Sequence, residues 1–467
     1  MAGIPLLAGV YTNTSPDFRT AYPVNLVPVP MSTGLSDAYL RPAEGFVLQG
    51  TGPGVDRGGI NWNGALYRVM GTKLVRIDEL GSVNVIGEVG AGGPVALDYS
   101  FDRLIINSGS LLFYSDGATV TQVTDPDLGV VSDVCWIDGY TMTTDGEFLI
   151  VTELNDPYAV SPFKYASSEA DPDPIIALQR LRNEVAALNR YTIEYFDNVG
   201  GVGFPFARIE GAQVQKGCIG PRACTVFVET VAFVGSGRNE QPNVYLANNA
   251  NATKISTREI DQLLASYTET QLSETVVESR NDNAHEHLYI HLPDRTIVYD
   301  HTASQAAGTP IWFVLTSALQ GFATYRARYM VWAYNRWNVG DVTTPDFGYM
   351  TSETGKHFGA NVRWEFSTPI AYNEGRGVVF NQLELVALTG SVEGGDDPTI
   401  STSYTLDGVS WSVDKSIRAG RQGQRAKRLV WFGQGHMRTW RIQRFRGDTR
   451  SNLAFARLEA TLEPLLY

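Results

Sequence analysis

The sequence predicts an all-β protein, a six- or seven-bladed β-propeller with an extended N-terminal arm and a C-terminal domain that resembles a β-sandwich. Charged residues make up only 19% of the 467 residues, whereas 46 glycines and an aromatic content of 11% are typical of turn-rich β proteins. Short β-like runs recur in groups of roughly 30 to 45 residues, the period of propeller blades. The chain also exceeds the usual span of one hydrophobic core, so two or more domains are expected.

The first 55 residues are predicted to form the arm. They contain seven prolines, which are too many for regular structure because each one removes a backbone donor and fixes φ. We therefore expect an extended segment over residues 1–55 that lies on its own domain or on a neighbouring subunit.

The predicted propeller covers residues 56–355. Its first group contains three strand candidates that each end on a turn signal, Leu66–Gly71, Lys73–Asp78 and Val83–Val89. The pattern restarts at Val95 and at Val134. After a break rich in Pro and Asp, further groups follow at Ile175–Asp197, Thr225–Ile255, His285–Thr316 and Phe322–Met350. No residue signature recurs at fixed offsets, so the pattern leaves the blade number at six or seven.

One segment of the propeller, Ile175–Asn189, also has a helical pattern, with Leu178, Leu181 and Val185 at i, i+3 and i+7. It can equally form two strands that turn at Arg182–Asn183. We predict strands because a helix would interrupt a blade.

A helix is predicted farther along the chain, over Thr257–Tyr267. Ser256 and Glu259 have the spacing of a capping box, and the apolar residues that follow share one helical face.

The last region, residues 356–467, has longer alternating runs such as Phe380–Leu388 and Thr439–Phe445, which predict a second all-β domain, a sandwich. Charge supports a boundary near residue 355. Residues 360–467 hold 14 Lys and Arg against 11 Asp and Glu, a net charge of +3, while the remainder of the chain carries −16 of the total of −13.

Several classes of function lack support in the sequence. The cysteines Cys135, Cys218 and Cys224 are too few and too scattered for a disulfide framework, and no CxxC pair indicates zinc, so a reducing compartment fits best. The N-terminus is a poor signal peptide, and no window supplies about 20 apolar residues for a membrane span. Walker A, GxSxG and HExxH motifs are absent from the sequence. We therefore predict a protein that is not an enzyme and has no cofactor and no metal site.

Two residue patterns contain side chains that can bind metals. His285, His287 and His291 lie on one face of a predicted strand, and alternate histidines can chelate a metal, but no nearby carboxylate or cysteine spacing completes the set. The acidic pairs Asp171/Asp173 and Asp396/Asp397 stand next to Gly or Pro, where Asp is favoured for turn hydrogen bonds alone. Structural roles are predicted for both.

Several short stretches follow one another in a set order over residues 22–300. They are YPVNLVP (Tyr22–Pro28), AYLR (Ala38–Arg41), YRVMGTKL (Tyr67–Leu74), TIEYF (Thr192–Phe196), VQKG (Val214–Gly217), HLP (His291–Pro293) and VYD (Val298–Asp300). Their order and spacing resemble those of the tail hub family of short-tailed bacteriophages, also called the nozzle or packaged-DNA stabilisation protein.

The chain thus resembles this family, and the resemblance implies a virion protein assembled in the host cytoplasm. It implies a homo-hexameric ring below the portal-adaptor ring that closes the DNA exit channel, retains the packaged double-stranded DNA, and joins the tail needle and the tailspike or tail fibre. No membrane insertion is expected. The alternative from a different class is a propeller enzyme acting on glycans, or a carbohydrate-binding protein.

The strongest local signal is a basic stretch, Lys415–Arg450, with 11 Lys and Arg against one acid, Asp448, and with interleaved aromatic residues. Its candidate interface or DNA-facing residues are Arg418, Arg421, Arg425, Lys427, Arg428, Arg438, Arg441 and Arg444. Such a stretch can grip phosphates and stack bases, or it can dock on an acidic protein surface. We favour protein contact, because a DNA exit channel must let the genome slide.

Overall fold

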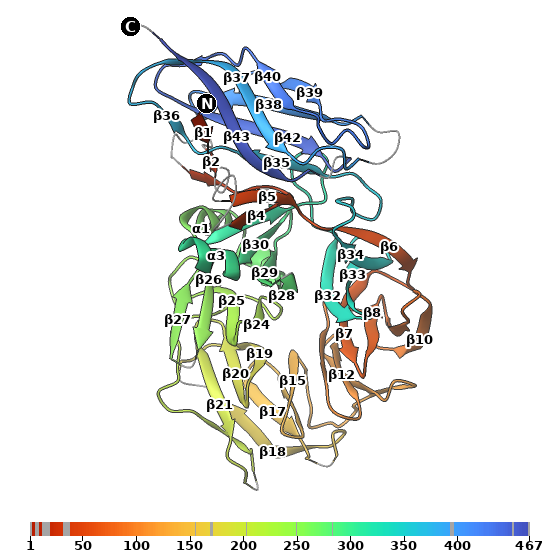
Figure 1. Cartoon of the computed structure of the whole chain (residues 1–467). Coiled ribbons are helices and arrows are strands. Elements are labelled where there is room, and N and C mark those ends of the chain that lie inside the picture. Colours follow the sequence, from red (N-terminus) through yellow and green to blue (C-terminus); the bar gives the residue numbers. More distant parts are fainter. Residues whose placement is uncertain are drawn as a thin grey trace.

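A computed structural model describes residues 2–4, 9–11, 19–30, 38–154, 156–168, 171–201, 203–248, 250–282, 284–392, 397–450 and 453–465. These residues form a ring of β-sheets and, against one edge of that ring, a β-sandwich (Figure 1). The predicted all-β class is confirmed.

The ring contains seven sheets within the described residues, which makes a seven-bladed propeller. The first four blades are each a four-stranded antiparallel meander in chain order. Their strands are β7 (Asp56–Trp62), β8 (Ala65–Met70), β9 (Lys73–Ile77) and β10 (Val83–Glu88); β11 (Ala96–Tyr99), β12 (Leu104–Ser108), β13 (Leu111–Ser115) and β14 (Val120–Gln122); β15 (Asp133–Ile137), β16 (Tyr140–Thr144), β17 (Phe148–Thr152) and β18 (Val160–Ser167); β19 (Ile175–Leu181), β20 (Glu184–Asn189), β21 (Ile193–Asn198) and β22 (Phe206–Arg208).

The last three blades vary this plan. Blade 5 has five strands, and blade 7 takes its outer strand from the N-terminal part of the chain. Their strands are β23 (Gly217–Cys218), β24 (Cys224–Phe227), β25 (Thr230–Ser236), β26 (Asn243–Asn248) and β27 (Asn251–Lys254); β28 (Val276–Asp282), β29 (His285–His291), β30 (Thr296–Asp300) and β31 (Ile311–Leu315); β32 (Ala327–Ala333), β33 (Arg336–Asp341), β34 (Asp346–Thr351) and β6 (Gly45–Thr51).

The inner strands of neighbouring blades pack side by side around the whole ring, from β7 through β11, β15, β19, β24 and β28 to β32, which returns to β7. The apolar clusters between blades explain this closure, because each sheet buries its two faces against its neighbours.

The sandwich packs two sheets around one apolar cluster that draws residues from both. One sheet holds β4 (Leu26–Pro30), β5 (Ala38–Pro42), β43 (Phe455–Pro464), β37 (Val378–Ala387) and β40 (Leu429–Phe432), with β1 (Ala2–Ile4) and β41 (His436–Met437) at its sides. The other holds β35 (Arg363–Ser367), β42 (Trp440–Asp448), β38 (Thr399–Thr405), β39 (Lys415–Arg418) and β36 (Ala371–Tyr372). A separate ribbon pairs β2 (Gly9–Tyr11) with β3 (Arg19–Ala21).

The prediction that prolines leave residues 1–55 without regular structure was wrong for β4, β5 and β6. Pro28 and Pro30 lie in β4, which is the edge strand of its sheet, and an edge strand tolerates proline because one side makes no ladder bonds. Of the other prolines, Pro5 and Pro16 lie outside the described residues.

The strand prediction for Ile175–Asn189 is confirmed by β19 and β20, which turn at Arg182 with a positive φ of 59°. The predicted helix is present as α1 (Arg258–Ala265), but its capping box was wrong. Thr257 is the N-cap and makes no side-chain cap bond, while Ser256 donates to Asp261 at 2.6 Å. Two short helices were not predicted, α2 (Glu269–Ser273) and α3 (His301–Ala307).

A buried ion pair, Asp56–Arg68, lies where the last blade meets the first. Arg68 also donates to the carbonyls of Tyr329 (2.8 Å) and Asn338 (3.1 Å) of blade 7, and both members of the pair are fully buried. Burial raises the pKa of Asp56 to about 7, and Arg68 offsets only part of this effect.

A folded-state pKa above the unfolded value of about 3.8 means that the folded chain binds the proton more tightly, so this group's contribution to stability falls as pH rises from about 4 through 7. We expect Asp56→Asn to remove this pH-dependent contribution to the free energy of unfolding. Urea unfolding at pH 5 and at pH 8 measures it: the free energy of unfolding should drop more steeply with pH in the wild type than in the variant. An equal change in the free energy of unfolding between pH 5 and pH 8 in both proteins would contradict the assignment of this pH dependence to Asp56.

Candidate functional site

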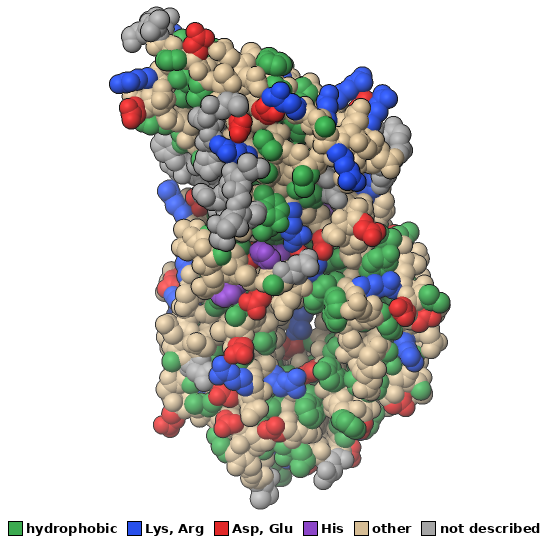
Figure 2. Space-filling model, viewed as in Figure 1, with side chains coloured by type: hydrophobic (Ala, Val, Ile, Leu, Met, Phe, Trp, Pro, Cys, Tyr) green, Lys and Arg blue, Asp and Glu red, His purple; other side chains and the backbone are tan. Residues whose placement is uncertain are grey.

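Part of the basic stretch forms an exposed loop on the sandwich, between β39 and β40. Five neighbouring cations, one at the end of β39 and four in the loop, are exposed: Arg418, Arg421, Arg425, Lys427 and Arg428. Gly420 and Gly423 turn the loop with φ of 104° and 82°, and Gln424 holds it by accepting from the backbone N–H of Arg421 at 3.0 Å. Figure 2 shows Lys and Arg side chains gathered on one shoulder of the sandwich.

Two carboxylates face this loop. Asp397 lies 3.0 Å from the guanidinium of Arg418 and 3.3 Å from that of Arg421, and Glu384 pairs with Arg428 at 2.7 Å. The Arg428 hydrogen bond lowers the pKa of Glu384. The three arginines remain 66 to 71% exposed, so the pairs add little to stability and leave the cations accessible to a partner.

Arg425 and Lys427 make no ion pair with a carboxylate of the described residues. The loop therefore carries more positive charge than its own domain compensates. We call these five residues, 418, 421, 425, 427 and 428, the basic loop.

The other three predicted cations do not join the basic loop. Arg438 is exposed in the turn before β42. Arg444 is half-buried, stacks on Trp411 with its guanidinium 3.9 Å from the ring centre, and donates to Ser403 at 3.1 Å.

Arg441 belongs to the sandwich interior rather than to the surface. Its guanidinium lies between the rings of Phe380 (4.2 Å) and Tyr404 (3.8 Å) and donates to Gln443 and to the carbonyl of Gln434. Burial lowers its pKa to about 9.

The aromatic residues of the basic stretch also fall into a buried and an exposed group, because successive side chains of a strand point to opposite faces. Trp431 and Phe445 are buried in the sandwich core, whereas Phe432, at the end of β40 away from the loop, is 70% exposed. One exposed ring with five exposed cations suits a protein interface, where arginine and aromatic residues are enriched.

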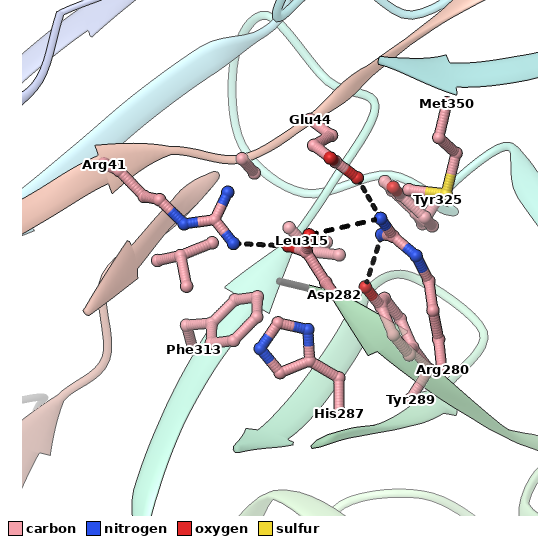
Figure 3. A pocket seen from close by; sticks show the side chains of 12 residues that line it. Arg41, Glu44, Arg280, Asp282, His287, Tyr289, Phe313, Leu315, Tyr325 and Met350 are labelled. Carbon is pink, nitrogen blue, oxygen red and sulfur yellow. Dashed lines mark hydrogen bonds and ion pairs between the residues drawn. The ribbon is translucent and has the colours of Figure 1, made fainter. Parts of the chain in front are cut away.

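A second polar cluster, which the sequence did not predict, joins the propeller to the sandwich (Figure 3). Arg41, in β5 of the sandwich sheet, pairs with Asp282 of blade 6, and Arg280 of the same blade pairs with Glu44 in the connection to β6. Arg280 also donates to the hydroxyl of Tyr289 at 3.2 Å. The cluster surrounds a pocket of about 10 Å³. We call these charged residues, 41, 44, 280 and 282, the junction clamp.

The charges of the junction clamp compensate one another. Burial alone would raise the pKa of Asp282, but Arg41 and Arg280 outweigh it and hold that pKa below its usual value. Arg280 is nearly fully buried, so its charge depends on Glu44 and Asp282.

The histidine face of β29 lies as the sequence predicts, but the expectation that no carboxylate completes the set was wrong. Asp300, on the neighbouring strand β30, is the register partner of His287 and accepts from His285 Nδ1 at 2.7 Å and from His287 Nε2 at 3.2 Å. His291 is hydrogen-bonded to Thr296 instead, at 2.8 Å.

The described members of the acidic pairs have structural roles, but their side chains contact residues distant in sequence instead of making the predicted local turn bonds. Asp173 accepts from the backbone N–H of Tyr191 (2.6 Å) and of Thr192 (3.1 Å), and Asp171 pairs with Arg238 at 2.8 Å. Asp396 lies outside the described residues.

A cavity of about 320 Å³ on the propeller axis is lined by residues of the inner strands. Its Glu278, whose pKa is raised by burial, accepts from the backbone N–H of Tyr329 (2.7 Å) and of Met330 (2.8 Å). Arg222 at the same cavity is ion-paired with Asp133. Both carboxylates are thus engaged in holding blades together. None of the described helices is long and apolar enough to span a bilayer.

A seven-bladed propeller closed by an N-terminal strand and joined to a sandwich by buried ion pairs defines the architecture of this protein. The chain belongs to the Bacteriophage P22 Gp10 family: the family's β-propeller model matches residues 2–355 and its β-sandwich model matches residues 363–463.

A curated relative is the tail hub protein gp10 of Salmonella phage P22, which is 27% identical over 98% of this chain and 99% of its own length. Among solved structures, the computationally designed Ika8 protein is 10% identical with a TM-score of 0.39, covering 72% of this chain and 96% of that chain. The Neurospora crassa Pan2 WD40 domain is 11% identical with a TM-score of 0.41, covering 64% and 88%.

Proposed function

We propose that this chain is a tail hub subunit, a structural protein of the tail of a short-tailed phage virion. The observation that carries the proposal is the match of both family models, which together span nearly the whole chain, in the order propeller then sandwich. The full-length relative named as a tail hub protein supports the same role.

In the assembly that we propose, six copies form a ring below the portal-adaptor ring in the host cytoplasm. The ring closes the DNA exit channel and bears the tail needle and the tailspikes. Its parts are an arm (1–55), a propeller (56–355) and a sandwich (356–467). The arm contributes β4 and β5 to the sandwich and β6 to the propeller, so it connects the two domains through shared sheets.

The basic loop is the proposed contact to a neighbouring subunit or to the adaptor. Its five exposed cations and the exposed ring of Phe432 suit an acidic protein surface, and residues 1–359 of each neighbouring copy carry a net charge of −16. DNA passing the channel is the alternative partner.

The chain is proposed to have no enzymatic activity. A propeller hydrolase needs paired carboxylates that are available to substrate, and the axial carboxylates of this propeller are bound to backbone amides and to Arg222. Turnover of any glycan by the purified chain would favour the enzyme alternative.

The direct test supplies the purified chain to DNA-filled particles that carry portal and adaptor but lack this subunit. We expect the chain to sediment with the particles and to stop loss of DNA. A chain that neither associates nor retains DNA would contradict the proposal.

The free chain is expected to be a monomer at low concentration and to form the ring on the tail. Exposed, screened charges give weak pairwise contacts, whereas a ring of adaptor sites raises the effective concentration of neighbours. Mass photometry of the free chain measures this. A stable hexamer without partners would contradict it.

A further inference from the structure

We infer that His285, His287 and Asp300 form a binding site for one divalent transition-metal ion of the zinc class. The three ligand atoms, His285 Nδ1, His287 Nε2 and an Asp300 carboxylate oxygen, lie within 4.8 Å of one another. Two imidazoles and one carboxylate are a donor set that zinc takes in proteins, with a fourth position left for water or another ligand.

The strand register builds this arrangement. His285 and His287 are two residues apart on β29, so their side chains share one face, and Asp300 stands opposite His287 on β30. With metal–ligand bonds of about 2.0 to 2.1 Å, ligand atoms of a tetrahedral ion lie about 3.3 Å apart. The observed contacts of 2.7 and 3.2 Å to Asp300 are close to that spacing.

The hydrogen bonds among the three groups mark where an ion would bind. The Asp300 carboxylate accepts both imidazole N–H groups, so in the metal-free chain protons occupy the positions that an ion would take.

When His287 binds through Nε2, its remaining ring proton moves to Nδ1. That atom is buried and has no hydrogen-bond partner among the described protein atoms, so the hydrogen bond from Nε2 to Asp300 is the protein contact of this ring that the ion replaces.

Local charge favours a cation. The junction clamp next to this site balances two carboxylates with two guanidiniums, whereas Asp300 has no guanidinium partner in the described part of the chain. Asp300 and His287 are shielded, with 0% and 2% of their side chains exposed, and His285 at 18% leaves a path for the ion.

Bound metal would cross-link the strands of blade 6 at the place where Asp300 caps α3 by accepting from the Ala303 N–H at 2.8 Å. Helix α3 in turn packs against β4 of the sandwich sheet, so the ion would stabilise the contact between blade 6 and the sandwich.

The test uses the full chain without an oligohistidine tag, treated with EDTA and dialysed. Titration calorimetry with Zn²⁺ should give one saturable site per chain, Co²⁺ should give the visible absorption of a tetrahedral complex, and Zn²⁺ should raise the melting temperature. His285→Gln, a change at the most exposed of the three side chains, should weaken binding by at least about 10- to 100-fold and abolish the melting shift.

The matched control is His436→Gln, which removes an exposed histidine of the sandwich and should leave binding unchanged. Asp300→Asn, checked for native circular dichroism, should behave as His285→Gln does. Absence of a saturable site, or equal binding by His285→Gln and wild type, would leave a hydrogen-bonded triad only and overturn the inference.

Discussion

Replacing Arg421, Arg425, Lys427 and Arg428 with serine is expected to lower incorporation of the chain into tails strongly while leaving its fold intact. If each charge contributes about 0.5 kcal/mol to a contact, four contribute about 2 kcal/mol, which is roughly a 30-fold change in affinity. The fold should survive because these side chains are exposed and their ion pairs are of the weak surface kind. Sedimentation of the variant with hub-deficient particles measures the loss.

A salt titration separates the two partners that the basic loop suits. Phosphate contacts weaken steeply between low and moderate salt, whereas contacts that bury arginine and aromatic rings persist. We expect incorporation of the wild type to tolerate physiological salt and its affinity for free DNA to be small there. Normal incorporation of the variant together with leakage of DNA would instead make the basic loop a DNA clamp.

The matched control removes four exposed positive charges from the propeller, by replacing Arg76, Arg182, Arg238 and Lys254 with serine. It changes net charge by the same amount and should leave incorporation near the wild-type level. An equal loss in both variants would assign the effect to net charge rather than to the basic loop.

Removing the central cation of the junction clamp is expected to destabilise the chain by about 3–5 kcal/mol. Arg280→Met leaves Glu44 and Asp282 with less compensating charge at a buried site, and breaking such a pair by removing one partner is costly. Denaturant unfolding, followed by far-ultraviolet circular dichroism, measures the change.

Two further variants define the cause. Adding Glu44→Gln to Arg280→Met should recover part of the stability, because one uncompensated carboxylate is then gone. Arg238→Met, which breaks a half-exposed pair with Asp171, should cost at most about 1 kcal/mol. Equal losses for Arg280→Met and Arg238→Met would show that the junction clamp is no stronger than a surface pair.

The propeller and the sandwich were predictable because their strands carry local signals. Turns fall at Gly, Asn and Asp. For Ile175–Asn189 the local pattern fits a helix equally, and the repeat of blades favours the two strands that form β19 and β20. The positions of the cations in the basic loop were predictable from turn signals. Arg441 was not, since strand alternation alone does not reveal which face of a sheet packs inward when the inner residue is charged.

The junction clamp and the Asp300 contacts were beyond sequence reasoning for different reasons. Arg41 and Asp282 are 241 residues apart, and Arg280 and Glu44 are 236 apart, so only the tertiary fold brings them together. Asp300 is close to His287 in sequence, but its contact depends on the register of β29 and β30, which the residue pattern does not fix without a known turn.

Blade 7 has a consequence for synthesis on the ribosome. Its outer strand β6 emerges early, and Thr51 of that strand meets Asp346 of β34 across 295 residues. At about 5–20 residues per second, β6 waits roughly 15–60 s for its partner, with an unpaired edge throughout. An unpaired strand edge is open to wrong pairing, and a nascent chain cut anywhere before β34 cannot close its propeller, so ring closure reports that at least three quarters of the chain has been made.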